Sequence, residues 1–321
     1  MNYFSPIVSA IVTLLLIAVI RSSKLGNKFQ DIPNNRSLHS SPIPRIGGVG
    51  MIAGMVSGWA LMFTNLAWWL ILPLIGLFVV SLLDDMHSLP VRQRLSAHLI
   101  AAAILVGGSG LLAGQGFAVA LVVLLLTVWM TNLYNFMDGS DGLAGGMALF
   151  GFGMYGIAAL IAHGDALAML NFTVSAAALG FLYNNFPPAK VFMGDAGSIP
   201  LGFLAAAMGL WGWQLGYWAI WFPVLVFSPF IVDASVTLAT STLRGARITE
   251  AHREHYYQRL IRMGWGHRKV ALVEYILMLA AGVSALACLQ RDWPWFLLMS
   301  WCGIYALLML MVDLKWKKEK P

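Results

Sequence analysis

The chain has 321 residues, of which 59% are hydrophobic and only 11% are charged, and its mean hydropathy is +0.76. A soluble globular protein of this length is much more polar, so the composition excludes that class and indicates a membrane protein with several spans. The two cysteines lie in separate apolar runs, which argues against a disulfide framework and against a cysteine metal site.

Apolar runs long enough to cross a membrane recur along the whole chain, so the sequence predicts an all-α polytopic membrane protein with about eleven transmembrane helices. The first run has no positive charge before it and no small-residue cleavage pattern, which favours a retained span over a cleaved signal peptide. We expect one integral membrane domain, 1–321. The predicted spans are 5–20, 46–63, 67–83, 95–113, 117–133, 143–162, 166–183, 199–214, 217–241, 270–289 and 294–313.

Lysine and arginine are distributed unequally between the two sets of loops that these spans define. Nineteen of the 20 basic residues fall on one side, and Arg291 is the single one on the other. Positive charge marks the cytoplasmic side, so the sequence predicts a periplasmic N-terminus and a cytoplasmic C-terminus. The net charge of +6 is then mainly a topology signal and does not indicate nucleic-acid binding. The predicted cytoplasmic loops are 21–45, 84–94, 132–142, 184–198 and 242–269.

The stretch 132–142, NLYNFMDGSDG, places polar side chains directly after an apolar run. Four of them recur at every third position, and two glycines argue that the helix ends within the stretch. We expect the last helical turn and the following loop to direct oxygen atoms toward a common spot. The alternative is that Asn and Asp serve here as ordinary turn residues. The four residues are Asn132, Asn135, Asp138 and Asp141.

Adjacent aspartates, Asp84 and Asp85, end the third predicted span. Two neighbouring carboxylates repel each other, so close to lipid they need a cation or a proton. A metal-assisted reaction would use such a pair, with one carboxylate near the cation and the other accepting a proton. The alternative is an interfacial pair that forms salt bridges with Arg92 and Arg94. Asp195 precedes another span, where it could be either a helix cap or a metal ligand.

Two cytoplasmic segments are rich in groups that bind anions. In 31–48 the glycine pair at 47–48 would let the backbone approach an anion that basic side chains hold, and a solvated loop that only sets topology is the alternative. The segment 242–270 has seven basic residues and three histidines, His252, His255 and His267. It suits phosphate binding or an amphipathic helix on the anionic leaflet. The candidates in the first segment are Arg36, His39 and Arg45.

Five motifs occur in an order that resembles the polyprenyl-phosphate N-acetylhexosamine-1-phosphate transferases. They are PNNRSLHSSPIPRIGG, the pair Asp84 and Asp85, NLYNFMDGSDGLAGG, NNFPPAKVFMGDAGS and the histidine-containing late segment. Within this family the chain is most similar to the bacterial enzymes that begin O-antigen synthesis on undecaprenyl phosphate. It is less similar to phospho-N-acetylmuramoyl-pentapeptide transferase. The HxHH pattern of the family reads His255-Tyr256-Tyr257-Gln258 here, so only its first histidine is kept.

The resemblance implies an enzyme that transfers an N-acetylated hexosamine 1-phosphate from a UDP-sugar to undecaprenyl phosphate and releases UMP. It implies dependence on Mg²⁺, or on Mn²⁺ in its place, and an active site on the cytosolic face of the bacterial inner membrane. Membrane lipids would surround the enzyme. Whether it forms a homodimer is left open by the sequence. By the same resemblance Asp195 and Asp85 would be metal ligands. The catalytic residues would be Asp84 as the base, Asp85, Asn135 and Asp138, and the substrate-binding residues would be Arg36, His39, Arg45, Asp141, Asn185, Phe192, Arg253 and His255.

The identity of the sugar and a competing class of function stay open at this point. Tyr257 and Gln258 replace two histidines, and the flat ring of Tyr256 or Tyr257 suits the methyl group of a 6-deoxy sugar better than an imidazole, so N-acetylfucosamine or N-acetylquinovosamine is a candidate beside N-acetylglucosamine. The alternative function is a secondary transporter of a nucleotide sugar or an ion, whose site would lie near the bilayer midplane. Most acids cluster instead at one end of the predicted spans, and we expect only Asp233 to lie well inside one. A scaffold that binds lipid intermediates without turnover is a third possibility.

Overall fold

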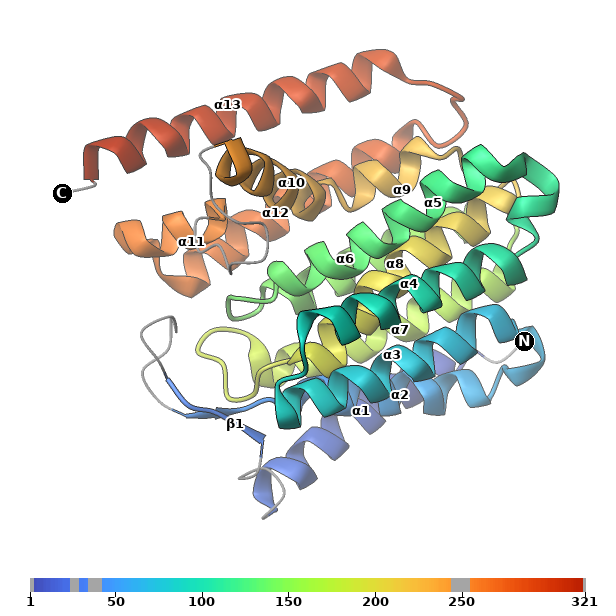
Figure 1. The fold of residues 1–321 in the computed structure, drawn as a ribbon, viewed down its shortest axis with the longest axis horizontal. Coiled ribbons are helices and arrows are strands. Elements are labelled where there is room, and N and C mark those ends of the chain that lie inside the picture. The colour runs from blue at the N-terminus through green and yellow to red at the C-terminus, as the bar shows by residue number, and fades with distance from the viewer. Residues whose placement is uncertain (1–2, 24–28, 34–41, 244–254, 320–321) are drawn as a thin grey trace.

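The computed structural model describes residues 3–23, 29–33, 42–243 and 255–319. Nearly all of the described chain is helical, which confirms the predicted all-α class (Figure 1). The helices of the first half are α1 (Ser5–Ser22), α2 (Gly47–Ala60), α3 (Trp68–His87), α4 (Val91–Gly108), α5 (Leu111–Phe136) and α6 (Leu143–Ile161). Those of the second half are α7 (Asp165–Asn185), α8 (Asp195–Gln214), α9 (Trp221–Val226), α10 (Ser228–Leu243), α11 (Tyr256–Leu260), α12 (Gly266–Ala287) and α13 (Trp295–Glu319).

Eight helical stretches within the described residues are long and apolar enough to cross a membrane, which confirms the polytopic membrane class. They are α1, α3, α5, α6, α7, α8, the stretch from α11 through α12, and α13. The remaining predicted spans are also helical. However, α2 has only 14 residues, α4 carries Arg92 and Arg94 in its first turn, and the predicted span 217–241 is broken at Phe227 into α9 and α10. The count of eleven spans and the sides of the termini stay predictions.

Glycines let α2 pack closely against α1. Gly50, Gly54 and Gly58 recur at every fourth position and therefore lie along one face of α2. A methyl group on Gly54 would collide with Thr13 of α1, and the carbonyl of Gly58 accepts a 2.6 Å hydrogen bond from the Ser5 hydroxyl. Small residues of this kind stabilise helix contacts in lipid, where the hydrophobic effect does not favour protein over lipid neighbours.

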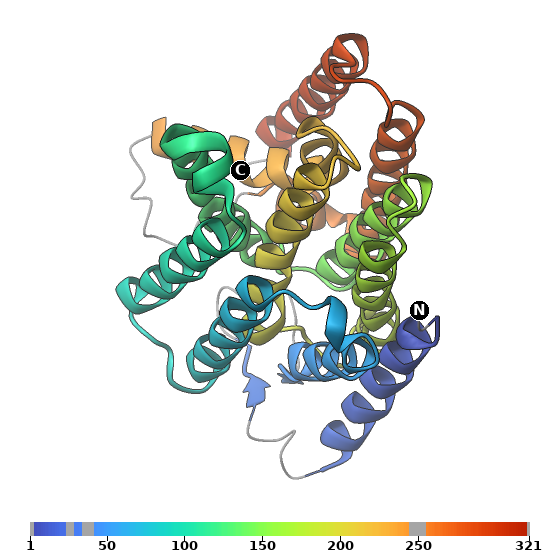
Figure 2. The same cartoon turned by 90° about the vertical axis from the view of Figure 1, so that its right-hand side faces the viewer.

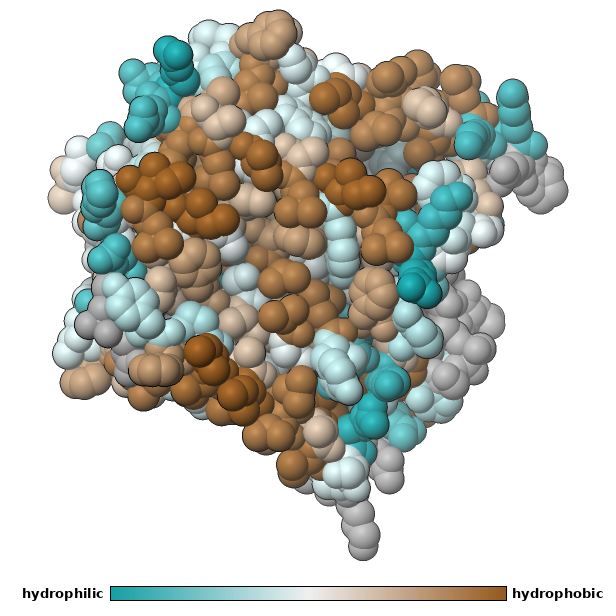
Figure 3. Space-filling view, turned by 180° about the vertical axis from the view of Figure 1, so that it is seen from behind, coloured by the Kyte–Doolittle hydropathy of each residue, from teal (hydrophilic) through white to brown (hydrophobic). Residues whose placement is uncertain are grey.

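The outer surface of the bundle has the pattern of a membrane protein. Apolar side chains cover the middle of the face in Figure 3, and most of the hydrophilic ones on that face lie toward its two ends. The first and last helices lie at opposite edges of the bundle, with α1 below and α13 above in both ribbon views (Figures 1 and 2). Helix α7 packs against α1, α2 and α6, and it therefore belongs to the interior of the bundle.

Segments that are distant in the sequence meet at one end of the bundle, on the left of Figure 1. The short strands β1 (Gln30–Asp31) and β2 (Ile43–Pro44) pair antiparallel there. The backbone of Phe192 continues this pairing, because its N–H donates to the Pro44 carbonyl and its carbonyl accepts from the Gly47 N–H, each at 2.9 Å. The same end holds the last turns of α3, α5 and α7 and the first turn of α8. This end of the fold carries the candidate site.

Candidate active site

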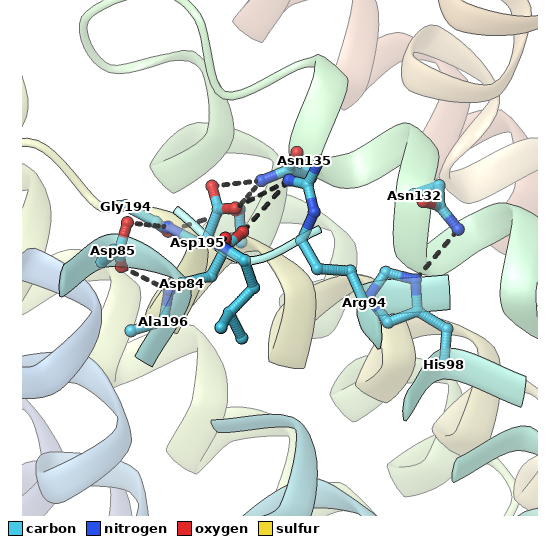
Figure 4. A network of polar contacts seen from close by, with 11 residues as sticks. Asp84, Asp85, Arg94, His98, Asn132, Asn135, Gly194, Asp195 and Ala196 are labelled. Atoms are coloured by element: carbon cyan, nitrogen blue, oxygen red, sulfur yellow. Dashed lines mark hydrogen bonds and ion pairs between the residues drawn. The ribbon is translucent and has the colours of Figure 1, made fainter. Parts of the chain in front are cut away.

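A cluster of carboxylates lies between the last turn of α3 and the first residue of α8 (Figure 4). Asp84 and Asp85 belong to α3, and Asp195 begins α8. Both oxygens of Asp85 accept backbone hydrogen bonds from α8, one from the N–H of Asp195 at 3.1 Å and one from the N–H of Ala196 at 2.9 Å. The structure therefore brings together the aspartate pair and Asp195, which are about 110 residues apart in the sequence.

Arg94 of α4 is the cation within this cluster. Its Nη1 lies 3.1 Å from Asp84 Oδ2 and 3.6 Å from Asp195 Oδ2. The turn between α3 and α4 fixes this geometry, because Asp84 Oδ1 also accepts a 2.6 Å hydrogen bond from the N–H of Leu89. The salt bridge that the sequence offered as an alternative is thus present between Asp84 and Arg94. Sequence reasoning missed the second contact, since the position of α8 beside α4 has no local signal.

Asp85 caps the start of α8. The N-cap residue of this helix is Gly194, which has no side chain to accept a hydrogen bond. The carboxylate of Asp85 satisfies the first two N–H groups in its place, and a negative charge at a helix N-terminus is favourable. The hydroxyl of Ser198, in the first turn of α8, does not cap the helix and donates to the Gly194 carbonyl at 3.1 Å. Asp195 is therefore not needed as a cap, and its carboxylate is left for other contacts.

Asn135 links the stretch 132–142 to the cluster. Its Nδ2 donates to Asp195 Oδ1 at 2.8 Å. Asn132 lies close to His98 Nδ1 instead, at 3.1 Å, and is set apart from the carboxylates (Figure 4). The expectation that all four polar residues of the stretch converge is wrong for Asn132. The helix α5 continues through Phe136, and three residues turn it by about 300°, so the two side chains differ by about 60° around the helix and by almost one turn along it. Asn132 therefore lies nearly one turn further from the carboxylates, beside α4.

Asp138 and Asp141 follow the end of α5 and have different surroundings. Burial raises the pKa of Asp138 well above its ordinary value, the carboxylates of Asp195 and Asp85 raise it further, and Arg45 opposes them. No described residue donates a hydrogen bond to the Asp138 carboxyl group. Asp141 Oδ2, in contrast, accepts a 3.0 Å hydrogen bond from the backbone N–H of Ala189. Asp138 thus keeps a carboxyl group that can contact a ligand, whereas Asp141 joins two loops.

Asn185 and Phe192, two of the predicted substrate-binding residues, belong to the framework behind the cluster. The buried Asn185 donates to the Val191 carbonyl at 2.9 Å and accepts from the Gly142 N–H at 2.8 Å. Both polar ends of its side chain are therefore used within the protein. Phe192 is half-buried, and its backbone joins β2 to the start of α2. A contact of either side chain with a nucleotide stays a prediction.

The predicted anion-binding residues are described only in part. Arg45 follows β2 and forms an ion pair with Asp31, with 2.7 Å between Nη2 and Oδ1. Arg36, His39 and Arg253 lie outside the described residues, so their roles stay predictions.

His255 and Asp233 fix the start of α11. Asp233 accepts backbone hydrogen bonds from Tyr256 at 2.9 Å and from Tyr257 at 3.1 Å. His255 is buried, and its Nδ1 lies 3.4 Å from Asp233 Oδ1. These contacts give Asp233 a structural role, which the sequence left open. The sequence led us to expect that Asp233 alone lies well inside a span. That expectation is wrong, because Glu274 also lies within a helix, α12.

Tyr256 and Tyr257 do not present free ring faces to a ligand. The guanidinium of Arg259 lies over the Tyr256 ring, 4.7 Å from its centroid. Tyr257 is fully buried, and its ring stacks on His255 with centroids 5.8 Å apart. The hypothesis that these rings bind the methyl group of a 6-deoxy sugar therefore loses its structural basis, because both are occupied by protein contacts.

The donor set at the cluster suits a hard divalent cation that arrives with its substrate. Within the described residues, no three Asp, Glu, His or Cys side chains are grouped as a complete metal site. Mg²⁺ usually takes one or two protein carboxylates and completes its octahedral shell with water and substrate phosphates. Asp85 and Asp195 could supply those carboxylates, so the residues fit a shared magnesium site but not a cage built by protein alone.

Known proteins resemble this chain over most of its length. Residues 67–212 match the model of the family described as glycosyl transferase family 4. The chain is 28% identical over 297 residues to a probable undecaprenyl-phosphate N-acetylglucosaminyl 1-phosphate transferase of Bacillus subtilis, covering 87% of this chain and 83% of the relative. It is 30% identical over 314 residues to the decaprenyl-phosphate N-acetylglucosaminephosphotransferase of Mycolicibacterium smegmatis, covering 84% and 77%. A phospho-N-acetylmuramoyl-pentapeptide-transferase of Lactobacillus helveticus is 28% identical over 304 residues, covering 85% and 92%.

Proposed function

The chain belongs to the polyprenyl-phosphate N-acetylhexosamine-1-phosphate transferase family, and on this premise we propose that it transfers N-acetylglucosamine 1-phosphate from UDP-N-acetylglucosamine to undecaprenyl phosphate. The observation that carries the proposal is the cluster of Asp84, Asp85, Asp195 and Arg94 at one end of an apolar helix bundle. A lipid phosphate anchored in the membrane and a water-soluble nucleotide sugar can meet only at such an end.

The reaction exchanges one phosphorus–oxygen bond for another. An oxygen of the lipid phosphate attacks the phosphorus that carries the sugar, and the bond from that phosphorus to the bridging oxygen breaks. UMP leaves with that oxygen, and the lipid diphosphate sugar is the other product. Such a transfer depends mainly on positioning and on neutralising negative charge. We propose that Asp84 accepts the proton of the lipid phosphate. We propose that Arg94, which contacts Asp84 and Asp195, neutralises negative charge on the diphosphate.

Mg²⁺ would supply further charge neutralisation at the diphosphate, and Mn²⁺ could replace it. Asp195 and Asp85 are the residues that we propose to hold it. Asn135 orients Asp195 through its 2.8 Å hydrogen bond, and Asp138 brings a fourth carboxyl group next to this site. The assignment of Asp141 and Asn185 to direct substrate contact is weaker, because their side chains are bonded to backbone groups of neighbouring loops.

An apolar pocket within the bundle suits the lipid substrate. It has a volume of about 180 Å³, lies between α5, α8 and α9, and is lined by residues that include Leu133, Tyr155 and Phe227. On α5 its lining ends at Leu133, two residues before Asn135 in the sequence. We propose that part of the polyprenyl chain lies in this pocket while its phosphate reaches Asp84.

The finer biological assignment extends the same proposal. The names of two of the relatives support N-acetylglucosamine as the sugar, and the covered tyrosine rings give no reason to prefer a 6-deoxy sugar. The sequence resemblance predicts that the product begins O-antigen or lipopolysaccharide synthesis at the cytosolic face of the bacterial inner membrane. The positive loops on one side support this orientation.

The test is product analysis with the purified protein in lipid nanodiscs. Undecaprenyl phosphate and a panel of UDP-sugars that includes UDP-N-acetylglucosamine, UDP-N-acetylfucosamine and UDP-N-acetylquinovosamine would be supplied with Mg²⁺. We expect equal amounts of UMP and undecaprenyl-diphosphate-N-acetylglucosamine by mass spectrometry. Counterflow of labelled nucleotide sugar in proteoliposomes without UMP release would instead establish a transporter, and binding of lipid without either event would establish a scaffold.

A further inference from the structure

The loop that carries Asp138 is held from outside by side chains of α11 and α12. Tyr257 of α11 donates from its hydroxyl to the Phe136 carbonyl at 3.1 Å. His267 of α12 lies 3.0 Å from the Ser140 hydroxyl through its Nδ1. Tyr275, two turns further along α12, donates to the Gly142 carbonyl at 2.7 Å. Three side chains therefore form hydrogen bonds with the loop 136–142 at Phe136, Ser140 and Gly142, and Asp138 lies between these attachment points.

Tyr257 meets the loop at Phe136 and at Gly139, on either side of Asp138. Its side chain is fully buried, and its hydroxyl both donates to the Phe136 carbonyl and accepts a 3.1 Å hydrogen bond from Gln258 Nε2. Its backbone N–H is bound to Asp233 at 3.1 Å. The tyrosine ring is thus fixed at both ends, so its hydroxyl has little freedom to follow a shift of the loop.

Gly139 shows how closely the loop and the tyrosine fit. A methyl group on Gly139 would collide with the Tyr257 hydroxyl oxygen, and the ring carbon Cζ would lie 3.3 Å away. The backbone of Gly139 is not in the left-handed region, unlike that of Gly142. An alanine at 139 would therefore be acceptable for the backbone alone. What excludes it is the hydroxyl of Tyr257.

We propose that Tyr257 is a positioning residue for Asp138, and that its hydroxyl sets where the Asp138 carboxyl group stands relative to Asp195 and Asp85. The resembling family has a histidine at the position of Tyr257. The late segment (242–270) would then act on the reaction through the loop 136–142 and not by contact with the sugar. Because Gln258 completes the hydrogen bonds of the tyrosine hydroxyl, the Tyr257-Gln258 pair replaces the two missing histidines as a unit. This inference rests on the proposed transferase function.

The first test is a cycle of Gly139→Ala and Tyr257→Phe. Tyr257→Phe removes the hydroxyl and keeps the ring, and we expect a fall in kcat of about 10-fold with KM for both substrates unchanged, since the loop is displaced but binding groups remain. Gly139→Ala should lower kcat by about 100-fold. The double variant should be faster than Gly139→Ala alone, because the colliding oxygen is gone. Independent effects that multiply, or Tyr257→Phe at the wild-type rate, would overturn the proposal.

The second test separates positioning from general stability. If Tyr257 acts through Asp138, the pair Asp138→Asn and Tyr257→Phe should be as slow as Asp138→Asn alone. A further loss in the pair would show an effect that does not pass through Asp138. Tyr256→Phe is the matched control, because its hydroxyl bonds to Asp313 on α13 at 3.3 Å and not to the loop; it should keep the wild-type kcat.

The failure of this inference differs from the failure of the proposed function. A wild-type protein that releases no UMP would refute the transferase itself. A wild-type protein that makes the lipid product, with a multiplicative cycle, would refute only the role of Tyr257. Gly107→Ala serves as the control for adding a methyl group, because Gly107 faces open space on α4; it should leave kcat unchanged and should not lower thermal stability.

Discussion

The substitution Asp195→Asn should separate activity from stability at the candidate site. The variant keeps the size of the side chain, and its amide oxygen can still accept the 2.8 Å hydrogen bond from Asn135. It removes the negative charge that lies 3.6 Å from Arg94 Nη1 and that we propose to contact Mg²⁺. We expect kcat to fall by at least about 100-fold, which corresponds to about 2.7 kcal/mol of lost transition-state stabilisation.

The cost to folding should be much smaller. The side chains of Arg94 and Asp195 are 33% and 25% exposed, and their separation of 3.6 Å is long for an ion pair. A partly solvated pair of this kind contributes about 1 kcal/mol or less. Arg94 also keeps its 3.1 Å contact with Asp84 in the variant. The thermal midpoint should therefore change by no more than about 4 °C.

The assay is UMP release at saturating substrates, paired with thermal unfolding of the same nanodisc preparation. Asp165→Asn is a suitable control, because Asp165 is an aspartate in the first turn of α7 and thus occupies a comparable place at the start of a helix. It should keep the wild-type kcat. Near wild-type kcat in Asp195→Asn would refute the assignment, and so would a loss of activity that merely follows a loss of folded protein.

Four further predictions concern the cluster and the topology. Asp84→Asn should lower kcat by at least about 100-fold, because it removes the proposed base and turns an amide N–H₂ toward Arg94; a normal rate would contradict that role. Asp85→Asn should lower both kcat and stability, the latter by about 0.5–2 kcal/mol, since one amide oxygen cannot cap two N–H groups; an unchanged thermal midpoint would exclude the capping role. EDTA should abolish UMP release, and Mg²⁺ or Mn²⁺ should restore it; activity that survives EDTA would remove the metal. A membrane-impermeant thiol reagent should label a cysteine placed at Asn2 in intact cells and miss one at Lys317, and the reverse pattern would invert the topology.

The helices were predictable because hydropathy in a membrane protein is set by lipid contact along whole helices. Each predicted span falls on helical structure, and several ends differ by only a few residues. The prediction was wrong where a single apolar run, 217–241, is two helices. Ser228 and Pro229 begin α10 immediately after Phe227, and proline favours the first turn of a new helix over the interior of an old one. The proline signal was present in the sequence and was outweighed by hydropathy.

The residues of the candidate site were easier to predict than their partners. Their positions at the ends of apolar spans indicated that Asp84, Asp85 and Asp195 are unusual for a membrane protein, because unpaired acids beside lipid are costly. Spacing did not reveal that Asp85 caps α8 or that Arg94 reaches Asp195, since both depend on how α3, α4 and α8 pack together. Likewise, the period of three in 132–142 predicted a shared target for four residues. Instead, Asn132 lies almost one turn before Asn135 on α5 and contacts His98, and Asp141 binds the backbone of the loop at Ala189.

The charge balance of the cluster gives an independent reason to expect a cation. Asp84, Asp85 and Asp195 carry three negative charges when ionised. Among the described residues Arg94 is the cation in contact with them, and the nearby Arg45 is paired with Asp31, which leaves two negative charges. Asp138 stands next to this group; burial raises its pKa, and the carboxylates of Asp195 and Asp85 raise it further. Excess negative charge in a partly desolvated site must be balanced by protons or by a bound cation. One divalent ion would balance the two remaining charges, and the Asp138 carboxyl group would then be free to contact the diphosphate. Because Tyr257 holds the Asp138 loop at Phe136, we expect metal binding and the contacts of the late segment to be coupled through that loop.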